Sequence, residues 1–168
     1  MSVNGNVAAL AARGIARLVA ARPGLEVEVN LFHRSPGRVR AVAGALRRAG
    51  LRELRGLRPT ARIPGLPSDR ARVDRAGIYV ADVCVVPLED GDRTEALRAL
   101  GKRVISIDLN PLSRTSRTAD LPIVDELVRA LDRLADGVAR DRTPLGSGRF
   151  VRVEPAALRA AALGTIGR

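Results

Sequence analysis

Residues 81–87 read Ala-Asp-Val-Cys-Val-Val-Pro, and residues 103–107 read Arg-Val-Ile-Ser-Ile. In both runs apolar and β-branched residues fill neighbouring positions, which is typical of strands that are covered on both faces. The stretch from Arg93 to Leu100 between them has a helical pattern. A strand that is joined through a helix to the next strand normally pairs with it in parallel, so these residues predict a βαβ unit.

The alternation of strand and helix continues on both sides of this unit. The patterns predict helices at 7–21, 36–50 and 125–135, and strands at 25–31 and 121–124. The segment 52–75 contains three prolines, and we expect a loop there with a short strand near Leu54 and one helical turn after Ser68. The expected fold class is α/β, a Rossmann-like three-layer sandwich with a mostly parallel sheet.

The pattern weakens after residue 136. We expect a Rossmann-like domain over 1–136 and a C-terminal extension over 137–168, with a possible strand at 149–153 and an Ala-rich helix from Pro155. Aromatic residues are only 2% of the 168 residues, so the core must consist of Val, Leu, Ile and Ala.

The cysteine count and the hydropathy of the chain indicate the cellular compartment. Cys84 is the only cysteine, which excludes a disulfide within the chain and any multi-cysteine metal site. No apolar run approaches the roughly 20 residues of a membrane helix. We therefore expect a cytoplasmic protein without a membrane partner.

The net charge of +11 comes from 29 Lys and Arg against 18 Asp and Glu, and Lys102 is the only lysine. Guanidinium groups favour anionic partners, either nucleic acids or small molecules with phosphate and carboxylate groups. The alternative is that most arginines lie on solvated helix faces. Nucleic acid is an unlikely partner, because the arginines are not interleaved with aromatic residues that could stack on bases.

The first residues, Ser-Val-Asn-Gly-Asn at 2–6, have the form of a strand end, a Gly turn and an N-cap for a helix that begins at Val7. Only two residues of that strand are present, whereas a strand is usually about 5–6 residues long. Either an edge position tolerates the short strand or the functional chain begins upstream of Met1, and we expect the second.

Three loops follow strands at the edge of the sheet where α/β proteins bind ligands. They are 4–6, 88–93 and 108–117. In the third, Asp108 and Asn110 can accept hydrogen bonds from a nucleotide, and Ser113, Arg114 and Thr115 can donate to phosphates. The alternative is that Asp108, Asn110 and Ser113 only cap backbone groups.

Other residues leave two interpretations open. Asp90 and Asp92, with Glu89, are weak candidates for Mg²⁺ ligands, but acidic residues also favour a helix N-terminus. His33 is a possible general base or an ordinary loop residue. The arginines in 64–72 predict either an anion-binding lid or a solvated linker.

Several stretches closely resemble one known family. They are Ser-Val-Asn-Gly-Asn-Val-Ala-Ala-Leu at 2–10, Val-Asn-Leu-Phe at 29–32, Ile-Pro-Gly-Leu at 63–66, Val-Pro-Leu-Glu-Asp-Gly-Asp-Arg-Thr-Glu-Ala-Leu at 86–97 and Ile-Asp-Leu-Asn-Pro-Leu-Ser-Arg-Thr-Ser-Arg-Thr-Ala-Asp at 107–120. The resemblance is to archaeal phosphopantothenate synthetase, that is, 4-phosphopantoate–β-alanine ligase. The family's segment before Ser-Val-Asn-Gly-Asn, which contributes arginines to ATP binding, has no counterpart, so we expect poor activity unless such residues exist upstream.

The resemblance implies a cytoplasmic homodimer in coenzyme A biosynthesis. It would condense 4-phosphopantoate with β-alanine at the expense of ATP, bound as the Mg²⁺ complex, and release AMP and diphosphate. The alternative is a degenerate homologue that binds nucleotide without ligase activity.

Family roles transfer to the matching positions. The implied ATP contacts are Asp108, Leu109, Asn110, Arg114, Thr115, Asp125 and Glu126, although the family has Asp-Asn at the last two positions. The candidate contacts for substrate or phosphate groups are Asn4, Gly5, Asn6, Arg34, Arg70 and Arg93. No residue is assigned as catalytic.

Overall fold

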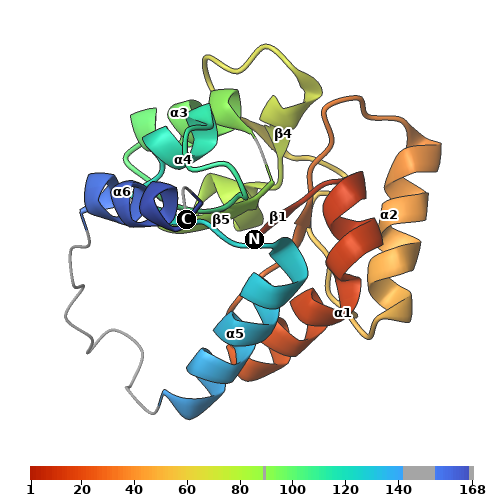
Figure 1. Ribbon diagram of the computed structural model, residues 1–168. Helices are drawn as coiled ribbons and strands as arrows, with labels where there is room; N and C mark the ends of the chain where they lie inside the picture. The colour runs from red at the N-terminus through yellow and green to blue at the C-terminus, as the bar shows by residue number, and fades with distance from the viewer. Residues whose placement is uncertain (89, 142–153, 167–168) are drawn as a thin grey trace.

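The computed structural model describes residues 1–88, 90–141 and 154–166. Five short strands run parallel within two sheets: β1 (Ser2–Val3) pairs with β2 (Glu28–Val29), and β5 (Val83–Pro87), β6 (Arg103–Ile107) and β7 (Leu121–Ile123) pair in the order β5-β6-β7. β1 lies beside β5, so the two sheets continue each other (Figure 1). The predicted βαβ unit and the Rossmann-like α/β fold are confirmed.

Helices form the outer layers. α1 (Gly5–Ala21), α2 (Pro36–Arg48) and α5 (Leu127–Arg140) pack together, and α3 (Gly91–Ala99), α4 (Arg114–Thr118) and α6 (Pro155–Ile166) form a second group (Figure 1). Each group covers apolar residues of the strands, because a helix with one apolar face must bury that face against another element.

Strand β5 shows how the two faces of the sheet are used. Val85 packs against the core cluster that contains residues of α1, α2 and α5, whereas Cys84 and Val86 lie in a second cluster together with Leu97 of α3. Successive side chains of a strand point to opposite faces, so a strand with both faces covered needs a continuous apolar run. This is why the sequence of β5 identified a central strand.

β2 is shorter than the predicted strand at 25–31, and its polar residue is not exposed. The carboxylate of Glu28 is buried and accepts hydrogen bonds from the backbone N–H groups of Asp74 (2.9 Å) and Ile78 (2.8 Å). Apolar–polar alternation normally indicates one solvated face. Glu28 departs from this rule, because its buried carboxylate binds the backbone of the segment that packs over it.

The segment 52–75 contains more structure than its prolines predict. Arg55 forms an isolated parallel bridge with Glu28, and a 3₁₀ turn η1 (Asp69–Ala71) follows Ser68, as expected. The sequence did not indicate the antiparallel pair β3 (Ala61–Arg62) and β4 (Arg72–Val73), or the π-helical turn η2 (Arg75–Tyr79). The possible strand at 149–153 and Glu89 lie outside the described residues.

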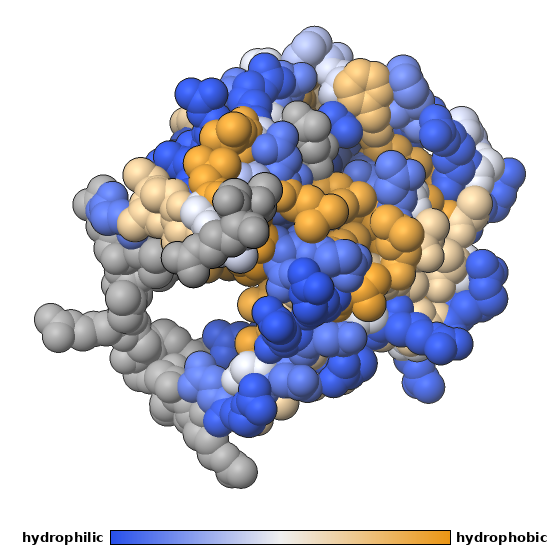
Figure 2. All heavy atoms as spheres, in the orientation of Figure 1, coloured by the Kyte–Doolittle hydropathy of each residue, from blue (hydrophilic) through white to orange (hydrophobic). Residues whose placement is uncertain are grey.

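Most arginines of the described residues are exposed, as the solvated-face alternative predicts. Figure 2 shows hydrophilic residues around the rim of one face and apolar residues near its middle. Among the described residues Arg93 is the one arginine that is buried, with 1% of its surface exposed. A buried guanidinium needs hydrogen-bonded partners, and these define the site.

Candidate nucleotide site at the carboxyl ends of the strands

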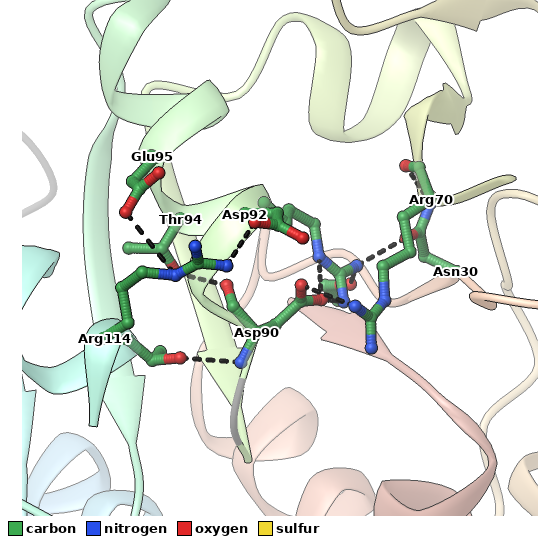
Figure 3. A network of polar contacts seen from close by, with 10 residues as sticks. Asn30, Arg70, Asp90, Asp92, Thr94, Glu95 and Arg114 are labelled. Carbon is green, nitrogen blue, oxygen red and sulfur yellow. Dashed lines mark hydrogen bonds and ion pairs between the residues drawn. The ribbon is translucent and has the colours of Figure 1, made fainter. Parts of the chain in front are cut away.

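The guanidinium of Arg93 joins the start of α3 to β1 and to the residue after β2. Figure 3 shows Asp90 and Asn30, two residues of this network. Nε donates a 2.6 Å hydrogen bond to Oδ2 of Asp90, and Nη2 contacts the same oxygen. Nη1 donates to the hydroxyl of Ser2 in β1 and to Oδ1 of Asn30, which follows β2. The ends of β1 and β2 are therefore fixed to the first turn of α3.

Asp90 links this cluster to the next strand. Its backbone N–H donates a 2.6 Å hydrogen bond to Oγ1 of Thr115, and its backbone carbonyl accepts one from the hydroxyl of Thr94 (2.9 Å). Thr115 belongs to α4, in the loop that follows β6. The predicted loops after β5 and β6 are thus tied together, and Arg93 ties them to Ser2 of β1 and to Asn30 after β2.

The electrostatics of the cluster depend on one carboxylate between two cations. Asp90 binds Arg93 through Oδ2 and Arg70 through Oδ1, the latter at 2.9 Å. Burial lowers the pKa of Arg93, and the neighbouring Asp90 works against that shift. Since Asp90 is 3% exposed, the cluster carries an excess of positive charge away from water.

Arg70 extends the cluster toward a small cavity. Its guanidinium carbon lies 4.8 Å from the centroid of the Phe32 ring, a cation–π distance. The segment around it is not a solvated linker, because Leu66 and Ala71 are buried in the core. Packing of these two apolar residues is what holds Arg70 over the edge of the sheet.

This small cavity, of about 170 Å³, gathers several predicted residues. Asn4, Gly5, Asn6 and Arg70 line it together with His33. Asn4 also caps α1 by accepting a 3.0 Å hydrogen bond from the N–H of Val7, so the N-cap is Asn4 and not Asn6 as predicted. A helix N-terminus beside a guanidinium is suited to an anion.

His33 and Arg38 also line this cavity. The ring of His33 meets that of Phe32 edge-on with 4.6 Å between centroids, and both interpretations of His33 remain open. Arg38, which the sequence analysis did not single out, also lines the cavity. The sequence feature that could have indicated Arg38 is its position in the first turn of α2, three residues after the N-cap Ser35.

The loop after β6 is held by its own polar side chains. Asp108 accepts hydrogen bonds from the N–H of Asn110 (3.0 Å) and the hydroxyl of Ser113 (2.6 Å), and Asn110 accepts one from the N–H of Leu112 (2.9 Å). Ser113 caps α4. The capping alternative therefore describes real contacts, which preorganise a loop whose Leu109 and Asn110 stay exposed.

Comparison with known proteins gives the family. The model of phosphopantothenate/pantothenate synthetase matches residues 1–144. The chain belongs to this family. It is 51% identical over 154 residues to 4-phosphopantoate–β-alanine ligase of Thermococcus onnurineus. The aligned residues cover 91% of this chain and 58% of the relative.

Two further synthetases give the same result. The ligase of Thermococcus kodakarensis is 52% identical, and the alignment covers 81% of this chain and 52% of the relative. The ligase of Methanosarcina mazei is 53% identical, and the alignment covers 80% of this chain and 53% of the relative. The chain thus spans about half the length of the curated relatives it matches. The resemblance inferred from the motifs is confirmed.

In this synthetase-family chain, the residues after β7 act as helix caps. Glu126 accepts hydrogen bonds from the N–H groups of Val128 (2.9 Å) and Arg129 (3.0 Å), and these bonds lower its pKa. Asp125 accepts a 2.6 Å hydrogen bond from Nε of Arg129, the main reason that its pKa is lowered. The predicted ATP contacts of both residues remain predictions.

The acidic residues after β5 face arginines in the described structure. Asp90 binds Arg70 and Arg93, and Asp92 pairs with Arg114, which also lies 3.6 Å from Glu95. No group of three or more His, Cys, Asp or Glu side chains that could hold a metal ion occurs within residues 1–88, 90–141 and 154–166. The described arrangement thus gives Asp90 and Asp92 cationic neighbours, and their role with Mg²⁺ stays a prediction.

The remaining predicted phosphate contact, Arg34, lies elsewhere. It lines a larger cavity with four other arginines and shares no cavity with Asn4–Asn6. In the described part of the chain, no helix is both long and apolar enough to cross a membrane.

Proposed function

We propose that this chain forms the nucleotide-binding part of an ATP-dependent ligase that joins 4-phosphopantoate to β-alanine in coenzyme A biosynthesis. One observation carries the proposal: the bond between Asp90 and Thr115 ties the loop after β5 to the loop after β6, in a chain 51–53% identical to proteins named 4-phosphopantoate–β-alanine ligase. Such convergence at a strand edge is where α/β proteins bind ligands.

The proposed ATP contacts are the exposed parts of the β6 loop and its helix. Asn110 and the backbone at Leu109 would receive the base or ribose, and Arg114 would face the phosphates. The buried Thr115 would support these contacts by holding the loop to Asp90. Asp108 would act mainly by shaping the loop. Asp125 and Glu126 would border the same site from the end of β7.

The proposed acid substrate lies toward the N-terminus of α1. Asn4, Gly5, Asn6 and Arg70 line one cavity, and their N–H groups and guanidinium suit a phosphate or a developing negative charge. Arg93 is a positioning residue in this scheme, because its guanidinium is taken up by Asp90, Ser2 and Asn30. It would act through Asp90 on Arg70.

The proposed reaction has two steps. The carboxylate of 4-phosphopantoate attacks the α-phosphate of ATP, so that the acyl-adenylate forms and diphosphate leaves. The amine of β-alanine then attacks the acyl carbon, an amide bond forms, a proton leaves the nitrogen, and AMP departs with the bond electrons. Positioned cations accelerate both steps by stabilising charge on the phosphates. Mg²⁺ would accompany ATP, and a cytoplasmic homodimer is part of the same proposal.

The test is AMP release by the purified protein. We expect AMP only when ATP, 4-phosphopantoate and β-alanine are all present, and Arg70→Met should reduce the rate by at least about tenfold through loss of a charge-assisted contact. Arg62→Met is the matched control, since Arg62 is an exposed arginine of the neighbouring β3 and should leave the rate unchanged. AMP release that is independent of either acid or amine would contradict the proposal.

A further inference from the structure

A second and larger cavity, of about 710 Å³, lies between α2 and the segment 57–59. Five arginines line it: Arg34, Arg40, Arg47, Arg58 and Arg72. Arg34 precedes α2, Arg40 and Arg47 belong to α2, Arg58 lies in the loop after Arg55, and Arg72 belongs to β4. No acidic residue lines this cavity within the described chain.

Helical spacing separates this cavity from the proposed ligase site. Pro36, Arg40, Ala43 and Arg47 lie along one face of α2 and line the arginine-rich cavity, whereas Arg38 and Val42 line the small cavity beside α1. The two cavities share no lining residue. A ligand of one would therefore be bound by a different set of side chains from a ligand of the other.

The positive charge here is poorly balanced by protein groups. Among the described residues, the side chains of Arg40, Arg47 and Arg58 have no hydrogen-bond or ion-pair partner. Arg72 pairs with Asp69, with 3.7 Å between Nη1 and Oδ1. Guanidinium groups gathered around one cavity raise the local positive potential, which attracts anions.

Arg34 shows the same imbalance at the inner end of the cavity. Its Nη2 donates to the backbone carbonyls of Gly56 and Leu57, while Nη1 is buried and has no acceptor in the described part of the chain. Burial and the guanidinium of Arg72 lower the pKa of Arg34. A buried donor without an acceptor is unfavourable, and a bound anion would supply the acceptor.

We propose that this cavity binds a small organic anion that carries two anionic groups, at least one of them a phosphate, on an apolar carbon skeleton. The arginines of α2 would bind one charged end of the ligand, and Arg58 would bind the other. Val39, Ala43 and Leu57 provide an apolar lining for the skeleton between them.

The shape favours a small molecule over a nucleic acid. The volume falls in the range of about 300–1,000 Å³ that is usual for ligand pockets. Single-stranded nucleic acids are held by a positive groove together with aromatic side chains that stack on bases, and no aromatic residue lines this cavity in the described chain.

The test is calorimetric titration of the full chain with 1,4-butanediol bisphosphate, whose skeleton is apolar, and, separately, with inorganic phosphate, in the absence of ATP and β-alanine. We expect saturable binding of the bisphosphate that is at least about tenfold tighter than that of phosphate, since two ends are held. The double variant Arg47→Glu/Arg58→Glu should weaken it by at least about tenfold. The double variant Arg48→Glu/Arg62→Glu changes the charge equally, outside the cavity, and should weaken it by less than about twofold.

Competition identifies the source of the anion. Displacement of the bisphosphate by 4-phosphopantoate would support the site but would move the acid substrate here from the cavity at the N-terminus of α1, against the proposed function. Displacement only by other phosphorylated acids would support the site as that of a separate effector and leave the proposed function unchanged. Equal weakening in the two double variants, no saturable binding, or displacement by a short single-stranded oligonucleotide would overturn it. Single variants Arg47→Ala and Arg58→Ala keep the test valid if the charge reversals unfold the protein. Ligase activity does not enter the readout, so this result stands apart from the proposed function.

Discussion

The backbone N–H of Asp90 donates a 2.6 Å hydrogen bond to Oγ1 of Thr115, and this bond joins the loop after β5 to the loop after β6. Both residues are buried, with 3% and 0% of their surface exposed. The bond therefore fixes two ligand-facing loops without contact with water.

Replacement of Thr115 by Val removes this bond while keeping the shape of the side chain. The N–H of Asp90 would be left buried without a partner, so we expect a loss of about 1–3 kcal/mol in the free energy of unfolding and weaker ATP binding. Thr115→Ser keeps the hydroxyl and should retain most of both. Urea denaturation and ATP titration measure the two effects, and equal behaviour of Val and Ser variants would count against the bond.

The buried Arg93–Asp90 pair should matter far more than an exposed pair. Arg93→Met leaves Asp90 with one cation and Ser2 and Asn30 without their donor, so we expect a loss of roughly 3–5 kcal/mol in unfolding free energy. Arg17→Met breaks the exposed pairs with Asp132 and Asp136 and should cost less than about 1 kcal/mol. Similar losses in both variants would refute a special role for the buried cluster.

Glu28 predicts a pH dependence of stability. Burial raises the pKa of its carboxyl above 4.5, although hydrogen bonds from Ile78 and Asp74 act in the opposite direction. With a raised pKa the folded state holds a proton that the unfolded state has released, so stability falls as the pH rises from 4.5 through the folded pKa. Asp125 and Glu126 have lowered pKa values, so the stability that they contribute is lost as the pH falls below their ordinary pKa values of 3.8 and 4.5.

The effect of Glu28 can be isolated by comparison with Glu28→Gln, which does not titrate. The stability of the wild type relative to this variant should decrease as the pH rises above 4.5 and then level off. Unfolding midpoints at a series of pH values provide the measurement. A constant difference between the two proteins would mean that Glu28 has the same pKa in both states.

Two glycines should respond in opposite ways to Ala. A Cβ on Gly77 would collide with Oε2 of Glu28, so Gly77→Ala should destabilise the protein by about 1–3 kcal/mol. Gly137 lies inside α5 with no atom within 4 Å of an added Cβ, and Gly137→Ala should stabilise it by about 0.5–1 kcal/mol. Thermal unfolding distinguishes these outcomes, and a tolerated Ala at 77 would contradict the described packing.

The sequence predicted the strands and helices whose patterns are set by simple burial, such as β5, β6 and α2. Two polar groups are buried for tertiary reasons that no local pattern shows. Glu28 lies in a segment predicted simply as a strand, and the guanidinium of Arg93, a predicted substrate or phosphate contact, is bound by other side chains of the protein. Short elements such as β3, β4 and α4 were missed because two to five residues carry no periodicity. The partners of Arg93, namely Asp90, Ser2 and Asn30, are far apart in sequence, so only the fold brings them together.

Candidate site residues were predictable to a different degree. The strand-end rule placed Asn4–Asn6 and Asp108–Thr115 at one edge of the sheet, and the structure agrees. Spacing alone did not separate Arg34 from Arg70, which line different cavities. Their separation depends on how α2 and the segment 57–72 pack, which no local pattern encodes.

The central claim, that the loop after β6 binds ATP, is tested most directly by the dissociation constant of ATP for two variants of one short helix. Arg114 and Arg117 are both exposed arginines of α4, but only Arg114 is proposed to face the phosphates. We predict that Arg114→Ala weakens ATP binding by at least about tenfold, as loss of a charge-assisted phosphate contact should, and that Arg117→Ala changes it by less than about twofold. Equal effects of the two substitutions, or no measurable ATP binding by the unaltered chain, would contradict the account.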